Sequence, residues 1–412
     1  MPYHLSFIIY TDKSMKKFIL LCTLFFIIPG YIYPSIKSLS DSAQISVIIE
    51  GPSNTNIVYM NGHVSLRVND PGLGIDYILS YGAFTSHIQL YHALVGKQVS
   101  ELWAMDTEAA IQDVVEKKGN VRVTEHILNL TSEEKERLWQ DLMFHALPEN
   151  RKYEYEFYRR NCSMLPVELI ENNVMGEIAY NFPVDAEQFT YKELSVFGKY
   201  PWIRLISDII FNLNTEKIPK RDEFFLPLKV EAGLLSADIV DKEGIARPLI
   251  LSSHTIREGV EVLPVKTRIT PLHFAFVLLT FTIILSLIEF WRRKYYRVYD
   301  CLLFGVAGLI GTALFFLVFP SNYQFLSTNY CIFWLHPVHF IGVVLFAFGK
   351  FDKPAFYYHI LNILLITYTI ASIFFFSRYY NPAFIPLMFC FWIRSLAGII
   401  RSGYLVMRRS KS

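Results

Sequence analysis

The last third of the chain alternates between long apolar runs and short charged or polar connections. A membrane-spanning helix needs roughly 20 mostly apolar residues, and five runs approach or reach that length. The third run is the shortest and has His336-Pro337 near its start, whereas the fifth contains Arg394 and two prolines. The pattern predicts an all-α transmembrane domain over residues 271–412 with five helices: Leu272–Trp291, Asp300–Phe319, Ile332–Phe348, Tyr357–Phe376 and Pro382–Ile400.

Residues 36–270 have a different pattern, in which charges, prolines and short apolar segments are mixed as in a globular domain. An eleven-residue apolar core with lysines before it stands near the N-terminus: Phe18–Ile28 after Lys13, Lys16 and Lys17. This is the layout of a secretory signal peptide. We therefore expect a signal peptide over residues 1–35, with Met15 a better start than Met1, and an exported domain over residues 36–270.

The charges in the connections between the apolar runs predict the orientation. If five helices cross in sequence, ten lysines and arginines fall on one side, and Arg378 alone falls on the other. Loops rich in lysine and arginine stay in the cytoplasm. We therefore expect a multi-pass protein of the bacterial inner membrane, with the large domain in the periplasm and a cytoplasmic C-terminus. The ten residues are Arg292, Arg293, Lys294, Arg297, Lys350, Lys353, Arg401, Arg408, Arg409 and Lys411.

Composition agrees with a membrane protein and excludes other classes. The 412 residues are 52% hydrophobic and 18% charged, whereas soluble domains average about 25% charged residues. This rules out a disordered, a collagen-like or a purely soluble chain. The formal net charge of +2 does not indicate a nucleic-acid partner. Five cysteines in a chain of this length do not make a disulfide framework.

Only one of those cysteines, Cys162, falls in the predicted exported domain. The alternating segment Tyr153–Phe157 before it is typical of a strand, and Val167–Asn173 after it has helical spacing. At the start of a helix, the dipole and the neighbouring Arg159 and Arg160 favour a reactive thiolate. The alternative is an inert buried thiol. If Cys162 is a nucleophile, the oxyanion of a tetrahedral intermediate has to be stabilised by hydrogen-bond donors. The candidates for this role are Asn161 and Ser163, at the start of the helix.

A thiolate nucleophile needs a base, and six histidines fall in the exported domain. His63 directly follows Gly62 and opens an alternating segment whose apolar residues share one face. His63 and Arg67 share the other face, so Arg67 is a candidate substrate-binding residue. For the remaining histidines a surface or capping role is the favoured interpretation: His87, His92, His126, His145 and His254.

These residues belong to an ordered set that resembles the Lnb-type N-terminal periplasmic domain family of Bacteroidota. The set comprises Gly62-His63-x-x-Leu66-Arg67-Val68, then Asp76–Phe84, then Asn150-Arg151 through Asn161-Cys162. Asn329-Tyr330 through Trp334-Leu335-His336-Pro337 is similar to the family's loop before its third span. The resemblance implies an α+β, permuted papain-like (NlpC-like) exported domain, in which the histidine strand precedes the cysteine helix.

The resemblance also implies the activity of a lipoprotein N-acyltransferase, with a phospholipid as acyl donor and a diacylated lipoprotein as acceptor. Cys162 would be the nucleophile that becomes a thioester, and His63 the base and later the acid. The family usually has Asn-Tyr-Gly where this chain has Ser80-Tyr81-Gly82, so Ser80 and Tyr81 are both candidates to orient His63. No cofactor and no metal are expected. Further candidate substrate-binding residues are Arg160, His336 and Arg394.

Two other functions fit the same residues. An NlpC-like cysteine amidase or peptidase acting on cell-wall peptides would use the same pair, Cys162 and His63. A non-catalytic envelope scaffold or sensor would use neither. Acyl transfer is favoured because both of its substrates are anchored in the bilayer, where a tethered active site meets them at high effective concentration. A soluble wall peptide would require no bundle of membrane helices.

Overall fold

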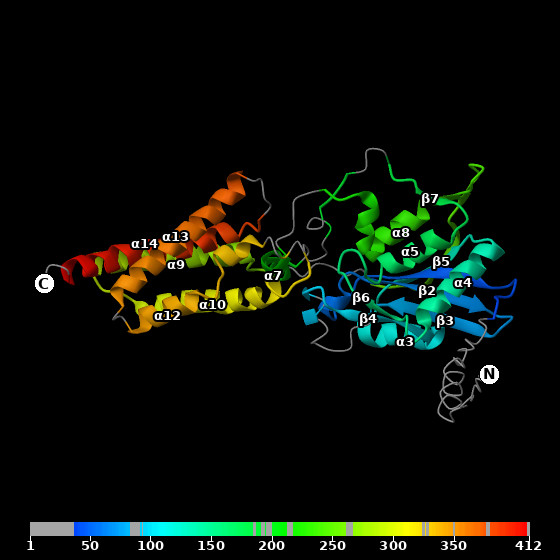
Figure 1. Ribbon diagram of the computed structural model, residues 1–412, viewed down its shortest axis with the longest axis horizontal. Helices are drawn as coiled ribbons and strands as arrows, with labels where there is room; N and C mark the ends of the chain where they lie inside the picture. Colours follow the sequence, from blue (N-terminus) through cyan, green and yellow to red (C-terminus); the bar gives the residue numbers. More distant parts are fainter. Residues whose placement is uncertain are drawn as a thin grey trace, which may run out of the picture. The chain divides into compact units, whose positions relative to one another are not determined.

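Figure 1 shows a computed structural model of the protein. The structure describes residues 37–82, 91–92, 94–183, 187–190, 194, 200–211, 217–260, 267–323, 326, 329–348, 351–375 and 380–409. The expected signal peptide over residues 1–35 and the histidine His87 lie outside these residues.

The exported domain contains a seven-stranded antiparallel sheet and a three-stranded antiparallel sheet. The larger sheet has the order β10 (Ile250–Arg257), β5 (Val123–Leu128), β1 (Gln44–Glu50), β2 (His63–Asp70), β3 (Ile75–Tyr81), β4 (Val99–Asp106) and β6 (Lys152–Glu154). The smaller sheet has the order β7 (Glu177–Tyr180), β8 (Ala237–Val240) and β9 (Ala246–Pro248).

Helices lie on both sides of the larger sheet (Figure 1). Apolar residues of α3 pack on Ile48 and Ile78 in one face of the sheet. Figure 1 shows α5 and α8 on the other side. The exported part is therefore a mixed α and β domain, as the sequence predicts. The described helices are η1 (Ile57–Tyr59), α3 (Thr107–Lys118), α4 (Ser132–Ala146), α5 (Met164–Asn173), α7 (Pro201–Phe211), η3 (Lys220–Phe225) and α8 (Pro227–Leu235).

Strand β2 confirms the alternation predicted from the sequence. Val64, Leu66 and Val68 are completely buried, because successive side chains of a strand point to opposite faces and these three share the core face. Antiparallel pairing then places Ser80 of β3 directly opposite Ser65 of β2. This register decides which β3 side chains come near the start of β2.

Four helices of the C-terminal domain are long and apolar enough to cross a membrane. Most of their bounds lie within a few residues of the predicted ones. The third of these helices begins at Asp352 rather than at Tyr357, and the fourth ends at Arg409 rather than at Ile400. They are α9 (Pro271–Arg292), α10 (Arg297–Val318), α13 (Asp352–Phe375) and α14 (Phe384–Arg409).

The prediction of the third membrane helix was wrong at its start. Instead of one helix over Ile332–Phe348, the chain forms η4 (Tyr330–Phe333), an irregular segment, and the short helix α12 (His339–Phe348). Pro337 has no N–H to donate and disfavours helical backbone at the residue before it. Ten residues of helix reach only about 15 Å, half of a bilayer core of roughly 30 Å. The described residues therefore support four full-length spans rather than five.

Close backbone packing holds the irregular segment inside the bundle. A Cβ atom on Gly311 of α10 would lie 2.4 Å from the backbone nitrogen of His336, so only glycine lets the two backbones approach this closely. Trp334 and Leu335 in the same segment are buried. Non-helical backbone is tolerated at membrane depth only where protein or a water-filled cavity surrounds it, and this segment meets that condition.

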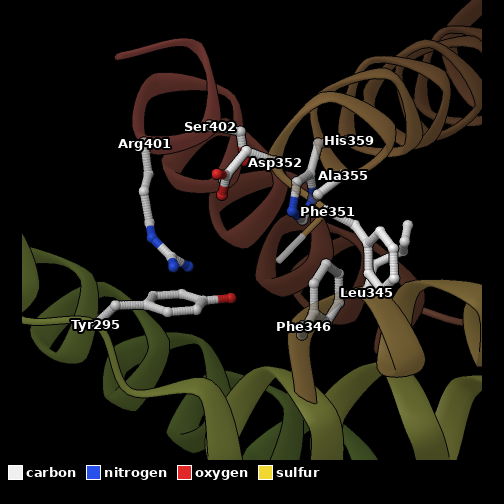
Figure 2. Close-up of a pocket in the computed structure, with 10 residues that line it drawn as sticks. Tyr295, Leu345, Phe346, Phe351, Asp352, Ala355, His359, Arg401 and Ser402 are labelled. Atoms are coloured by element: carbon white, nitrogen blue, oxygen red, sulfur yellow. The ribbon is translucent and has the colours of Figure 1, made fainter. Parts of the chain in front are cut away.

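Contacts at one end of the bundle indicate how the chain crosses. The guanidinium carbon of Arg401 in α14 lies 3.6 Å from the ring centroid of Tyr295, which stands between α9 and α10. Figure 2 shows both residues around a small pocket that is also lined by Asp352, the first residue of α13. The start of α13 and the later part of α14 therefore lie at the same end as the connection between α9 and α10.

This arrangement leads to a topology prediction. Reporter fusions after Phe197 and Ser321 are expected to be exported, and fusions after Lys294 and Ser410 to be cytoplasmic. The physical reason is that η4, the irregular segment and α12 together would carry the chain across once, which gives five crossings. An exported reporter after Ser410 would mean that this segment does not cross, and would leave four crossings.

Candidate active site

Cys162 lies in a turn just before α5, and Asn161 fixes the start of that helix. The Asn161 side-chain oxygen accepts hydrogen bonds from the backbone N–H groups of Ser163 and Met164, each at 2.9 Å. Its side-chain nitrogen donates to the carbonyl oxygen of Phe157 at 2.9 Å. This is helix capping by a side chain, and it confirms that Cys162 stands just before a helix. The predicted strand before it is shorter than expected, because β6 ends at Glu154 and turns follow up to Cys162.

The cap changes the candidates for oxyanion binding. The Asn161 side chain is occupied by backbone groups, and the N–H of Ser163 points to Asn161. The Ser163 hydroxyl lies 3.9 Å from the Cys162 sulfur. Among the described residues, nothing accepts a hydrogen bond from the N–H of Cys162 itself. That N–H is therefore available to a bound ligand.

The end of β3 comes close to the thiol because of a glycine. Gly82 has a positive φ of 87°, a conformation that glycine adopts at little cost. A Cβ atom there would lie 3.5 Å from the Cβ of Cys162 and 3.5 Å from the Tyr153 hydroxyl. The segment Ser80-Tyr81-Gly82 therefore leads directly to the cysteine, although Cys162 is 80 residues away in the sequence.

His63 is the first residue of β2 and contacts Ser80. The His63 Nε2 atom lies 2.5 Å from the Ser80 hydroxyl oxygen, because Ser80 is opposite Ser65 and therefore diagonal to His63. If Nε2 carries the hydrogen, it donates to Ser80 and leaves the lone pair of Nδ1 for the thiol. Tyr81 is directed elsewhere, with its hydroxyl 2.9 Å from the Nδ1 atom of His145. Of the two predicted candidates, only Ser80 contacts His63.

The surroundings of Cys162 favour the thiolate. Burial alone would raise the pKa of the Cys162 thiol, but the charge of His63 and a hydrogen bond with it lower that pKa. The Ser163 hydroxyl and the charge of Lys118 act in the same direction, so the pKa lies below its ordinary value. Lys118 is held by an ion pair with Glu50, the residue opposite His63 in the sheet. A thiol with a lowered pKa is the form of cysteine that acts as a nucleophile.

Two tyrosines beside the thiol, the half-buried Tyr153 and the buried Tyr155, were not identified as site residues from the sequence. Burial raises the pKa of Tyr153 and of Tyr155, and the nearby charge of Cys162 raises both further. Both hydroxyls are therefore neutral at ordinary pH. In the sequence these two tyrosines are only part of the alternating segment Tyr153–Phe157. The strand β6 covers Lys152–Glu154 and so includes only the first of them.

The two arginines predicted to bind substrate in the exported domain have different surroundings. Arg67 forms ion pairs with Asp76 at 2.8 Å and with Glu125 at 2.9 Å, so its guanidinium group is occupied and the contacts favour a structural role. Arg160 is exposed, and no carboxylate in the described part of the chain pairs with it. Of these two arginines, only Arg160 is without a carboxylate partner among the described residues.

The two predicted substrate-binding residues of the membrane domain make their contacts within that domain. The His336 ring is buried and stacks on His339, with ring centroids 3.9 Å apart. Arg394 is completely buried and forms ion pairs with Asp300 at 2.5 Å and Glu289 at 2.6 Å. The contacts of Arg394 favour a role in holding helices together, in place of the predicted role in substrate binding.

Among the described residues there is no cluster of metal ligands at this site, and the pocket of Figure 2 is in the membrane domain. The described residues contain no group of three or more His, Cys, Asp or Glu placed to hold a metal ion. The pocket is lined by residues at the α9–α10 end of the bundle, including His359 and Arg401, and by neither Cys162 nor His63.

The turn that carries Cys162 is in contact with the membrane domain. The Tyr323 hydroxyl, from the connection after α10, accepts a hydrogen bond from the N–H of Phe157 at 3.3 Å. Tyr323 also packs with Phe211 and Leu326 in a small buried apolar cluster. Cys162 is thereby placed close to the end of the membrane helices at which the exported domain is attached.

Comparison with known families covers most of the chain. The family model of the Lnb N-terminal periplasmic domain matches residues 36–195, and that of the Lnb transmembrane domain matches residues 264–403. No curated protein and no solved structure matches this chain.

Proposed function

Because this chain belongs to the Lnb family, we propose that it is a membrane-bound lipoprotein N-acyltransferase. Family membership itself indicates an inner-membrane enzyme that modifies lipoproteins. The proposal adds the reaction, in which an acyl chain moves from a phospholipid to the α-amino group of a diacylglyceryl-cysteine. It also adds the arrangement of the exported domain, which we propose to be permuted papain-like, with the β2 histidine before the α5 cysteine in the chain.

In the first half-reaction, the Cys162 thiolate attacks an ester carbonyl of the donor phospholipid. The C–S bond of a thioester forms, the C–O bond of the ester breaks, and the lysophospholipid leaves with a proton from His63. The N–H of Cys162 stabilises the oxyanion of the tetrahedral intermediate. Ser80 keeps the imidazole in the tautomer whose Nδ1 faces the thiol.

In the second half-reaction, the α-amino group of the lipoprotein attacks the thioester carbonyl. The C–N bond of an amide forms, the C–S bond breaks, and the amine proton passes to His63 while the thiolate is restored. An α-amino group has a pKa of about 8, so roughly a tenth or more of it is neutral and nucleophilic at pH 7. The products are a triacylated lipoprotein and the free enzyme.

The observation that carries this proposal is the contact of His63 with Cys162, the single cysteine of the exported part, at a turn that adjoins the membrane domain. A water-free apolar site protects a thioester from hydrolysis. An amidase acting on soluble wall peptides would need the same pair of residues but not their position beside the membrane helices.

The intermediate provides the test. Purified protein incubated with phospholipid and no lipoprotein is expected to gain the mass of one fatty acyl group, and the Cys162→Ser variant is expected to gain none that hydroxylamine removes under neutral conditions. Adding a diacylated lipopeptide should discharge the adduct and give triacylated lipopeptide and lysophospholipid. Intact-mass analysis and lipid analysis measure both. Cleavage of a γ-D-glutamyl wall peptide, with no adduct and no lysolipid, would instead support the amidase.

A further inference from the structure

Helix α7 (Pro201–Phe211) lies between the two matched domains in the chain and has an unusual composition for a helix outside the membrane spans. Its sequence, PWIRLISDIIF, puts its tryptophan, leucine and isoleucines on one side, whereas Arg204, Ser207 and Asp208 share the other. Its two charged residues, Arg204 and Asp208, form an ion pair with each other at 3.7 Å. A helix with one wide apolar side covers that side with protein or with lipid.

The first turn of α7 is attached to the start of α9. The Trp202 indole N–H donates a hydrogen bond to the carbonyl oxygen of Ile269 at 2.9 Å, two residues before α9 begins. The Trp202 ring also packs edge-on against Phe274 in the first turns of α9, with ring centroids 5.8 Å apart. The N-terminal end of α7 therefore lies level with the beginning of a membrane span.

The last turn of α7 is attached to two other parts of the membrane domain. The Asn329 side chain, just before η4, donates to the carbonyl oxygens of Ile209 and Ile210 at 2.9 and 2.8 Å. The Asn381 side chain, just before α14, donates to the Asp208 carboxylate at 2.9 Å. An 11-residue helix is about 16 Å long. Anchored at both ends to the same end of the bundle, α7 runs across that end rather than along the spans.

One part of the apolar side of α7 packs on the bundle, and the neighbouring part is open. Leu205 and Ile209 pack against the buried apolar cluster of the membrane domain. Trp202 and Ile206, four residues apart and therefore on one face, are 38% and 56% exposed. Because Trp202 contacts Phe274, which is itself exposed on α9, the open face continues the lipid-facing surface of that span.

We infer that α7 is an interfacial helix, embedded through Trp202 and Ile206 in the periplasmic leaflet of the membrane. Tryptophan is enriched at membrane–water interfaces, where its ring is in apolar surroundings while its N–H keeps a polar partner. The only charges on α7 neutralise each other, so little opposes insertion of its open face.

The far end of α7 connects this lipid surface with the proposed active site. Phe211, the last residue of α7, stacks on Phe157 with ring centroids 5.8 Å apart and contacts Tyr158 edge-on. Phe157 in turn holds the side chain of Asn161, beside Cys162. We therefore infer that α7 forms the lipid-contacting wall along which a donor phospholipid reaches the thiol. This role in delivery rests on the proposed function.

A photo-crosslinking experiment tests the location of α7 without depending on activity. A benzophenone amino acid is placed at Ile206, at Val277 on the exposed face of α9, or at Ile245 between β8 and β9, which is 67% exposed. The protein is irradiated in vesicles of phosphatidylethanolamine and phosphatidylglycerol and analysed by intact mass. Positions 206 and 277 are expected to gain the mass of a phospholipid, and position 245 is not. Lipid adducts at 277 but none at 206 would overturn the inference.

A second measurement tests the delivery of donor lipid. Acyl-enzyme formation is measured with long-chain phospholipid in the bilayer, and with a short-chain, water-soluble phospholipid added to vesicles of ether-linked lipids, which cannot donate an acyl chain. Ile206→Glu is expected to lower the ratio of the first rate to the second several-fold, whereas the matched Ile245→Glu leaves the ratio unchanged. An unaltered ratio in Ile206→Glu would overturn the delivery role. If the wild type forms no adduct with either donor, the acyltransferase proposal fails while the crosslinks still decide where α7 lies.

Discussion

Replacing Cys162 by alanine is expected to abolish both the acyl-enzyme and the triacylated product, while the protein stays folded and inserted in the membrane. No other side chain of the site can form the thioester. Removing one member of a nucleophile–base pair typically lowers turnover by a factor on the order of 10⁴–10⁶. His63→Ala is expected to cause a loss of similar size, and the double variant to be no worse than Cys162→Ala, because the two residues act as a unit. Product formation from diacylated lipopeptide measures the loss.

Cys301 offers a matched control for this loss. It is also a free cysteine, partly buried, but it lies in α10 and its sulfur faces the carbonyl oxygen of Val343. Cys301→Ser is expected to keep its activity. Near-wild-type turnover by Cys162→Ala, with Cys301→Ser equally active, would remove the thiol mechanism and favour a scaffold role.

A pH profile separates a catalytic His63 from a merely structural one. His63 lowers the pKa of the Cys162 thiol, so alkylation of that thiol in the wild type should begin at lower pH than in His63→Ala. A folded His63→Ala variant with the same alkylation profile as the wild type would show that the imidazole does not act on the sulfur.

The local parts of this site could be predicted from the sequence. The glycine before His63 predicts the start of β2, and the change from alternating to helical spacing around Cys162 predicts the turn before α5. Both depend on a few neighbouring residues, for which backbone preferences and periodicity are sufficient. The order of His63 and Cys162 in the chain also carries the family resemblance.

The parts that depend on long-range pairing could not be predicted. Ser80 and Tyr81 are adjacent in the sequence, and only the register of β3 against β2 directs Ser80 to His63. Likewise, Arg67 is predicted to face substrate because its partner Glu125, 58 residues away, is invisible in a local pattern. The irregular start of the third crossing depends on Gly311, which belongs to another helix.

Arg394 is the clearest case of this limit, and its replacement is the other change expected to have a large effect. As a single arginine in an apolar run, it is expected to face protein, water or a lipid headgroup, and the run itself does not decide among the three. In the structure its guanidinium group contacts Asp300, Glu289 and the Ser286 hydroxyl, and so joins α14 to α9 and α10. One positive and two negative charges are thereby buried together.

Arg394→Met is therefore expected to destabilise the membrane domain strongly. Without the arginine, two buried carboxylates face each other with no counter-charge, and removing one partner of a buried ion pair typically costs about 3–5 kcal/mol. Arg401→Met is the matched control, because Arg401 lies over the Tyr295 ring and no carboxylate in the described residues pairs with it. Thermal unfolding in detergent should show a large loss for Arg394→Met and a small one for Arg401→Met.

A compensating variant distinguishes this structural role from substrate binding. In the triple variant Arg394→Met, Asp300→Asn and Glu289→Gln, the uncompensated charges are gone, so much of the lost stability is expected to return, since replacing all members of a buried ionic group can be nearly neutral. Activity should return with it, because the folded bundle is all that the cluster supplies. If the triple variant is as stable as the wild type but needs far more phospholipid to form the acyl-enzyme, Arg394 contacts the donor, and the role predicted from the sequence is the right one.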